Sequence, residues 1–70
     1  MVNVNENEKL HYAKQLYYSY GHDDFGGTPN ERLEWADSVE PTVLYSRLEQ
    51  MGWTCIRGCY WVRTEFAGNY

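Results

Sequence analysis

The sequence predicts a small α+β domain in which three helices precede a C-terminal β-hairpin. Two observations carry this prediction. Apolar residues recur with helical spacing in three segments before residue 52, and a run of aromatic and β-branched residues then surrounds an Arg-Gly pair. The chain of 70 residues has the size of one domain. We therefore expect residues 1–70 to fold as a single domain.

The first helix is predicted over residues 6–20. At about 100° per residue, its larger apolar side chains share one arc of the helix. The members of this arc are Leu10, Tyr12, Ala13, Leu16, Tyr17 and Tyr20. Gly21 is predicted to end the helix, because the residue after a helix commonly has a positive φ. Before the helix, Val2 and Val4 alternate with asparagine, which leaves open a short third strand.

The second helix is predicted over residues 29–37 and the third over residues 41–51. Thr28 can accept from the backbone amide of Glu31 while the Glu31 carboxylate returns the bond, and this reciprocal cap marks a helix start. Both helices also begin with a proline, whose φ is already helical. Gly52 is predicted to close the third helix. The buried stripe of that helix is predicted to be Leu44, Leu48 and Met51.

Residues 53–63 are predicted to form the hairpin, with a two-residue turn at Arg57-Gly58. This register places one set of side chains on the inner face: Trp53, Cys55, Tyr60 and Val62. The opposite, wetter face receives Thr54, Ile56, Cys59, Trp61 and Arg63. Because the two sulfurs then point to opposite faces, we expect Cys55 and Cys59 to be reduced, metal-free thiols. The tail is predicted to extend the second strand through Phe66.

Aromatic residues make up 17% of the chain. A buried Trp or Tyr removes about 150–250 Å² from water, so a short chain can use these residues to complete its core. The predicted core is Leu10, Ala13, Leu16, Leu33, Leu44, Leu48, Met51, Trp53 and Val62. Trp35 and Trp61 fall outside this set, and we expect at least one of them to be substantially exposed.

The charge balance is acidic, with 10 Asp and Glu against 6 Lys and Arg and a net charge of −4. The acidic residues gather in the middle of the chain, and such a surface repels phosphate and attracts basic partners. No apolar run approaches the roughly 18 residues that a membrane span needs, so we expect no membrane association. The N-terminus lacks the basic and apolar segments of an export signal, which favours a cytoplasmic location.

Catalytic chemistry is not expected. The chain is too short for a dinucleotide-binding or barrel fold, and no nucleophile–base pairing stands out. The His22-Asp23-Asp24 triplet contains metal-ligating residue types but lacks partner histidines and carboxylates at ligand spacing. The sequence therefore predicts a non-enzymatic protein with no catalytic residue, no metal and no cofactor.

The order helix, helix, Gly-Trp, hairpin over residues 30–62 resembles the layout of a winged helix-turn-helix domain. This resemblance is architectural and implies nucleic-acid binding through the helix at 42–51 and the turn of the wing. The residues it would place at DNA are Thr42, Ser46, Arg47, Gln50 and Arg57. Only two of them are basic and Glu40 precedes the helix, so we treat this DNA-binding regulator as the alternative hypothesis.

The favoured hypothesis is a small acidic protein-binding module, monomeric or homodimeric. In size and composition it is similar to the small proteins with which bacteriophages block a basic surface of a host enzyme or defence complex. Acidic residues would speed the encounter and tryptophans would supply the buried contact. The residues predicted to bind the partner are Asp23, Asp24, Glu31, Glu34, Trp35, Asp37 and Trp61.

Overall fold

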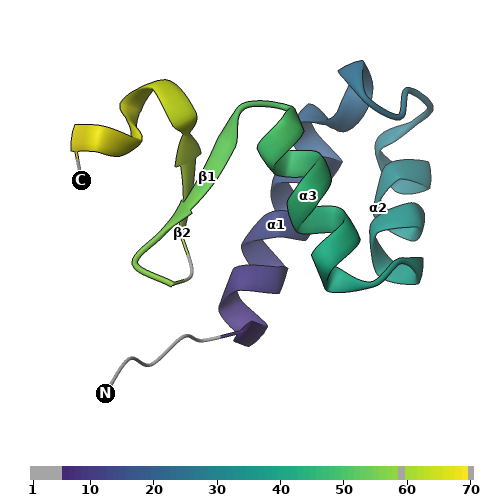
Figure 1. The fold of residues 1–70 in the computed structure, drawn as a ribbon. Coiled ribbons are helices and arrows are strands. Elements are labelled where there is room, and N and C mark those ends of the chain that lie inside the picture. Colours follow the sequence, from purple (N-terminus) through teal and green to yellow (C-terminus); the bar gives the residue numbers. More distant parts are fainter. Residues whose placement is uncertain (1–5, 59, 70) are drawn as a thin grey trace.

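The computed structural model describes residues 6–58 and 60–69 and has the α+β architecture that the sequence predicts (Figure 1). Its helices are α1 (Glu6–Tyr20), α2 (Pro29–Ser38) and α3 (Pro41–Gln50). The strands β1 (Trp53–Ile56) and β2 (Tyr60–Arg63) form a two-stranded antiparallel sheet, and two 3₁₀ segments are η1 (Gly21–Asp23) and η2 (Thr64–Asn69). All three predicted helices are confirmed to within one residue at each end. The open prediction of a strand at residues 2–4 lies outside the described residues.

Helix α1 is the central element, because it contacts α2, α3 and β2. Figure 1 shows the hairpin at one end of the molecule and α2 at the other, with α1 and α3 between them. The core residues are Ala13, Tyr17, Ala36, Leu44, Leu48, Trp53 and Trp61. The molecule measures 38 × 24 × 15 Å, so its core is a thin layer rather than a sphere. No helix among the described residues is long and apolar enough to cross a bilayer.

The buried face of two helices differs from the prediction. In α1, Ala13 and Tyr17 are fully buried, whereas Tyr12 at the edge of the predicted arc is 37% exposed. In α2, Arg32 and Ala36 are buried, while Leu33 is only partly buried and lies outside the core. The prediction for Leu33 is wrong because the buried residues of α2 are Arg32 and Ala36. Hydrophobicity alone does not predict that an arginine is buried in place of a leucine.

Gly21 does not end α1 by a positive φ as predicted. The chain continues directly from α1 into η1, and the backbone carbonyl of Gly21 accepts from the amides of Asp24 and Phe25 at 3.0 and 2.9 Å. Gly21 is buried, and a Cβ there would lie 3.0 Å from Cδ of Arg32 and 3.1 Å from Cδ2 of Tyr17. A side chain at this position would therefore crowd Arg32 and Tyr17, so the glycine allows close packing rather than a special backbone conformation.

The predicted helix caps are present. The amide of Glu31 donates to Thr28 Oγ1 at 3.2 Å, and the Thr28 amide donates to Glu31 Oε1 at 2.8 Å. At the end of α3, Gly52 has φ 98° and its amide donates to the carbonyl of Glu49 at 3.1 Å. Local signals thus determine where α2 begins and where α3 ends.

The hairpin register differs from the prediction by one residue. Cys55 pairs with Trp61 and Ile56 with Tyr60, so three residues rather than two separate the strands. The shift moves Trp61 to the inner face beside Cys55, and it moves Tyr60 outward. Trp61 is only 9% exposed, and its indole N–H donates to the carbonyl of Lys9 at 3.2 Å. This register buries the larger ring and satisfies its donor, which the two-residue turn would not.

The tail also differs from the prediction, because residues 64–69 form η2 and do not extend β2. The amide of Thr64 donates to the carbonyl of Gly52 at 2.8 Å, and its hydroxyl lies 2.8 Å from that of Thr54. Among the described residues, Cys55 is a free thiol whose pKa is raised by burial. Cys59 lies outside the described residues, so the prediction for the cysteine pair stays a prediction.

Candidate binding surfaces

Asp24 is one of the residues predicted to bind the partner, but its carboxylate is bonded to other side chains of the same chain. Its carboxylate accepts from the Tyr17 hydroxyl at 2.7 Å and from Arg47 Nη1 at 2.6 Å. The side chain is only 19% exposed. Burial, and then the hydrogen bond and charge of Asp24, raise the pKa of Tyr17 above its usual value. Asp24 therefore ties the end of η1 to α1 and α3 and is not part of a free surface.

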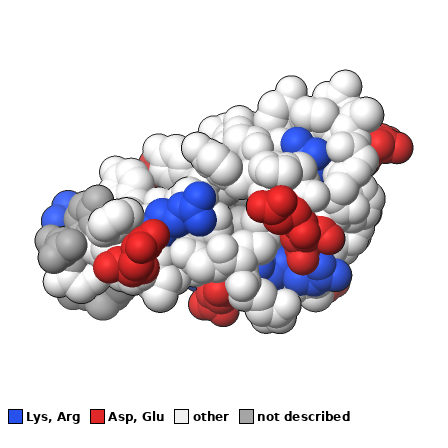
Figure 2. All heavy atoms as spheres, turned by 90° about the horizontal axis from the view of Figure 1, so that it is seen from above, with Lys and Arg blue, Asp and Glu red and all other residues white. Residues whose placement is uncertain are grey.

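Two further acidic residues of the predicted surface also have partners. Asp37 pairs with Lys14 at 2.8 Å, and Glu31 forms the cap of α2. Glu34 is exposed, as is Asp23, whose carboxylate lies 3.4 Å from His22 Nε2. Figure 2 shows one face of the molecule on which acidic and basic side chains are interspersed instead of gathering into a patch of one sign. The predicted acidic surface is thus largely divided into internal pairs.

The expectation that Trp35 or Trp61 is substantially exposed is wrong. Trp61 is buried, as described above. Trp35 is partly buried, with its ring centroid 4.8 Å from that of Tyr17 and 6.1 Å from that of Phe25. The guanidinium of Arg47 lies over the same ring at 5.3 Å. Both tryptophans complete the core because a chain this short has few other large side chains for that purpose.

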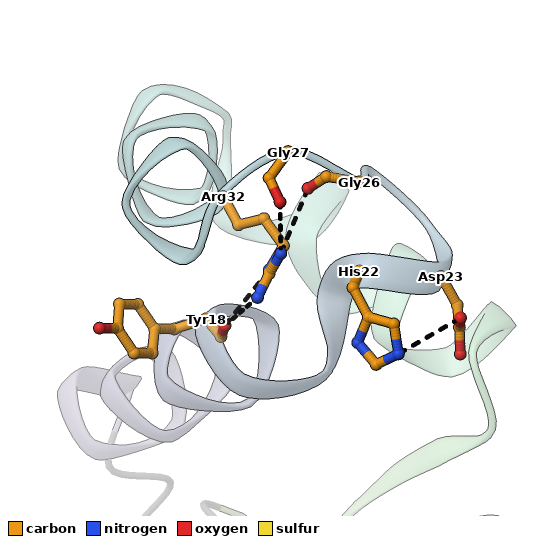
Figure 3. Close-up of polar contacts among 6 residues, drawn as sticks. All are labelled: Tyr18, His22, Asp23, Gly26, Gly27 and Arg32. Atoms are coloured by element: carbon orange, nitrogen blue, oxygen red, sulfur yellow. Dashed lines mark hydrogen bonds and ion pairs between the residues drawn. The ribbon is translucent and has the colours of Figure 1, made fainter.

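The loop before α2 is held by Arg32, which was not among the predicted site residues. Its guanidinium donates to the carbonyl of Tyr18 at 2.9 and 3.2 Å, to that of Gly27 at 3.0 Å and to that of Gly26 at 3.3 Å (Figure 3). Tyr18 lies in the last turn of α1, where carbonyls lack helical partners. The one signal in the sequence is the pair Gly26-Gly27, six and five positions before Arg32; in the structure both glycines have a positive φ.

The surface of the DNA-binding alternative is poor in available positive charge. Helix α3 exposes Thr42, Ser46 and Gln50 as predicted, but Glu40 and Glu49 are exposed with them. Arg47 is paired with Asp24. Arg57 is exposed in the hairpin turn with φ 54°. Within the described part of the chain, Arg57 is thus the one predicted DNA contact whose positive charge is not already paired, and the acidic neighbours of α3 oppose phosphate binding.

The described surface includes two grooves that are candidate binding sites. The first, which we call the arginine groove, has a volume of about 400 Å³. It is lined by Tyr20, His22, Asp23, Asp24, Gln50, Met51, Trp53 and Arg63. The second, which we call the tyrosine groove, has a volume of about 280 Å³ and runs between α1 and β2. It is lined by Tyr12, Gln15, Leu16, Ser19, Tyr60 and Trp61.

The rim of the tyrosine groove is a pair of stacked rings. Tyr12 from α1 and Tyr60 from β2 lie with centroids 5.7 Å apart and an interplanar angle of 28°. They are 37% and 48% exposed, respectively. The sequence predicts both tyrosines on inward faces, and the shifted hairpin register explains why Tyr60 lies outside.

Compared with models of protein families, with curated protein sequences and with solved structures, the chain matches none.

Proposed function

We propose that the protein is a small, non-enzymatic protein-binding module that contacts its partner through the tyrosine groove. The observation that carries this proposal is the exposed, stacked pair of Tyr12 and Tyr60 beside a groove of about 280 Å³. Tyrosine is enriched in protein interfaces because its ring gives contact area while its hydroxyl remains hydrated. The proposal keeps the function class that the sequence favours and replaces the tryptophan contacts with tyrosines.

The groove is also preorganised for binding. Its floor includes Trp61, which is fixed by core packing and by the hydrogen bond to Lys9. Its rim rings rest on each other across two elements, so less side-chain entropy is lost when a partner covers them. A stacked aromatic pair beside a buried tryptophan is typical of an interface hot spot.

The charge supports a basic partner. The net charge is −4, and three glutamates are exposed: Glu34 on α2, Glu40 in the turn after it and Glu49 on α3. Such charges speed the approach of a basic surface even from outside the contact area. The protein would then act as an inhibitor of the phage type, by occupying a basic surface of a host enzyme or defence complex.

Affinity capture from extract of the native host tests the proposal. The chain is compared with the Tyr12→Ser/Tyr60→Ser double variant and with a control, Phe66→Ser, which removes an exposed ring from η2. We expect a partner with a basic surface that is lost with the double variant and retained by the control, while circular dichroism shows all three folded.

The contradicting results are equally distinct. Capture that is unchanged in the double variant would exclude the tyrosine groove as the contact surface. A low-salt mobility shift with random duplex DNA that weakens steeply as salt rises would instead favour the winged-helix alternative.

A further inference from the structure

We propose that the arginine groove is a binding site for a carboxylate attached to an apolar group. Arg63 lines this groove, and its guanidinium carbon lies 4.6 Å from the ring centroid of Trp53 and 5.9 Å from that of Tyr20. The groove shares no residue with the tyrosine groove, so the inference does not depend on the proposed function.

Arg63 is the one Lys or Arg side chain that lines this groove, and among the described residues it has no counter-ion. Among the described residues, no carboxylate lies within ion-pair distance of Arg63, whereas Asp24 is bonded to Tyr17 and Arg47. Asp23 has His22 Nε2 at 3.4 Å. Asp24 is thus paired with the positive charge of Arg47, whereas Asp23 faces a histidine that is a counter-ion only when protonated. Arg63 supplies the positive charge in this groove that an incoming anion can meet.

The position of Arg63 over two rings suits carboxylate recognition. A guanidinium that rests on aromatic faces keeps its N–H donors available at its edge, and these match the two oxygens of a carboxylate. The rings also restrict a side chain that would otherwise lose considerable rotamer freedom on binding. Hence the contacts with Trp53 and Tyr20 both orient Arg63 and lower the entropic cost of binding.

The remaining lining defines the rest of the ligand. Met51, Tyr20 and Trp53 provide apolar contact, and the Gln50 side-chain amide can both donate and accept hydrogen bonds. The volume of about 400 Å³ lies within the range of about 300–1,000 Å³ that small-molecule sites occupy. The ligand class is an aryl or alkyl carboxylate, which could be a free acid or the C-terminal residue of a peptide.

Nuclear magnetic resonance titration of the full chain tests this site. The probes are phenylacetate as the free acid and acetyl-Gly-Phe as the peptide terminus, each matched by its amide, which keeps the shape and removes the charge. The signals to follow are the Trp53 indole N–H and the Arg63 Nε–H. We expect saturable shifts with one or both acids and none with the amides. Binding of acetyl-Gly-Phe alone identifies a peptide terminus, and binding of phenylacetate identifies a free acid.

Variants link the shifts to Arg63. Arg63→Gln is expected to weaken acid binding by about tenfold or more, because a charge-assisted bidentate contact is lost. Arg57→Gln, the matched control at an exposed arginine of the turn, should bind as the original chain does. If Arg63→Gln does not fold, Arg63→Lys is used in its place. This variant keeps the positive charge and should also weaken acid binding. Equal shifts with acids and amides, no saturable shift at millimolar acid, or unchanged affinity in folded Arg63 variants would overturn the proposal.

Discussion

Asp23 and Asp24 are neighbours in the sequence with different roles in the structure. The Asp23 side chain is 86% exposed and that of Asp24 is 19% exposed. Asp24→Ala would leave the buried Tyr17 hydroxyl without its acceptor and Arg47 without its counter-ion. We expect a loss of about 1–3 kcal/mol in the free energy of unfolding. Asp23→Ala is the matched control and should stay within about 0.5 kcal/mol. Urea denaturation measures both, and equal losses would show that Asp24 does not hold the loop.

The raised pKa of Tyr17 leads us to predict that the protein is less stable in alkali. The pKa of Tyr17 is raised in the folded state by burial and by Asp24. Below the ordinary tyrosine pKa both states keep the proton and the contribution is fully present. Above about pH 10 the unfolded chain releases a proton that folded Tyr17 retains, so stability falls as the pH rises.

The Tyr17→Phe variant isolates this contribution. Between pH 9 and 11, the unfolding free energy of the original chain should fall more steeply than that of the variant, by up to about 1.4 kcal/mol per pH unit. The other tyrosines are common to both chains and cancel in the difference. Parallel pH profiles would show that Tyr17 ionises equally easily in both states.

For individual residues, the sequence shows which side chains are charged but not which of them pair in the fold. The acidic cluster and its loop are evident from the sequence, but the partner of Asp24 is 23 positions away, at Arg47. Local sequence patterns cannot pair residues across that distance, and Asp24 was therefore predicted to be available to a partner.

At the level of elements, Arg32 joins the end of α1 to the loop before α2. Its contacts with three carbonyls need a planar fork of donors, which lysine cannot reproduce. Arg32→Lys should therefore destabilise the fold by about 1–3 kcal/mol, as expected when buried acceptors lose their donors. Arg57→Lys at an exposed position is the matched control. Thermal unfolding that does not distinguish the two variants would contradict this role.

Helix boundaries were predictable because their signals are local. The Thr28–Glu31 cap and the positive φ at Gly52 each involve only a few adjacent residues. The role of Gly21 was not predictable in the same way, because one of the two side chains that crowd it, Arg32, comes from another helix. The same limit applies to η2, whose position depends on the bond from Thr64 to the carbonyl of Gly52.

At the scale of the whole molecule, the position of the tyrosine groove depends on how the hairpin packs against α1. A one-residue change in register exchanges the two faces of a strand. Turn chemistry alone favoured a two-residue turn, but the molecule gains more by burying Trp61 against Tyr45, with ring centroids 5.6 Å apart, than by burying Tyr60. Tertiary packing therefore decided which aromatic residue became surface, and the sequence pattern could not weigh it.

The measurement that tests this placement most directly is the set of cross-strand nuclear Overhauser effects of the hairpin. Directly paired residues of an antiparallel ladder have Cα atoms about 4.5–5.5 Å apart, so their backbone protons give strong signals. We expect contacts from Cys55 to Trp61 and from Thr54 to Val62. Contacts from Cys55 to Tyr60 and from Thr54 to Trp61 would instead place Trp61 outside and Tyr60 inside, and the tyrosine groove would not exist.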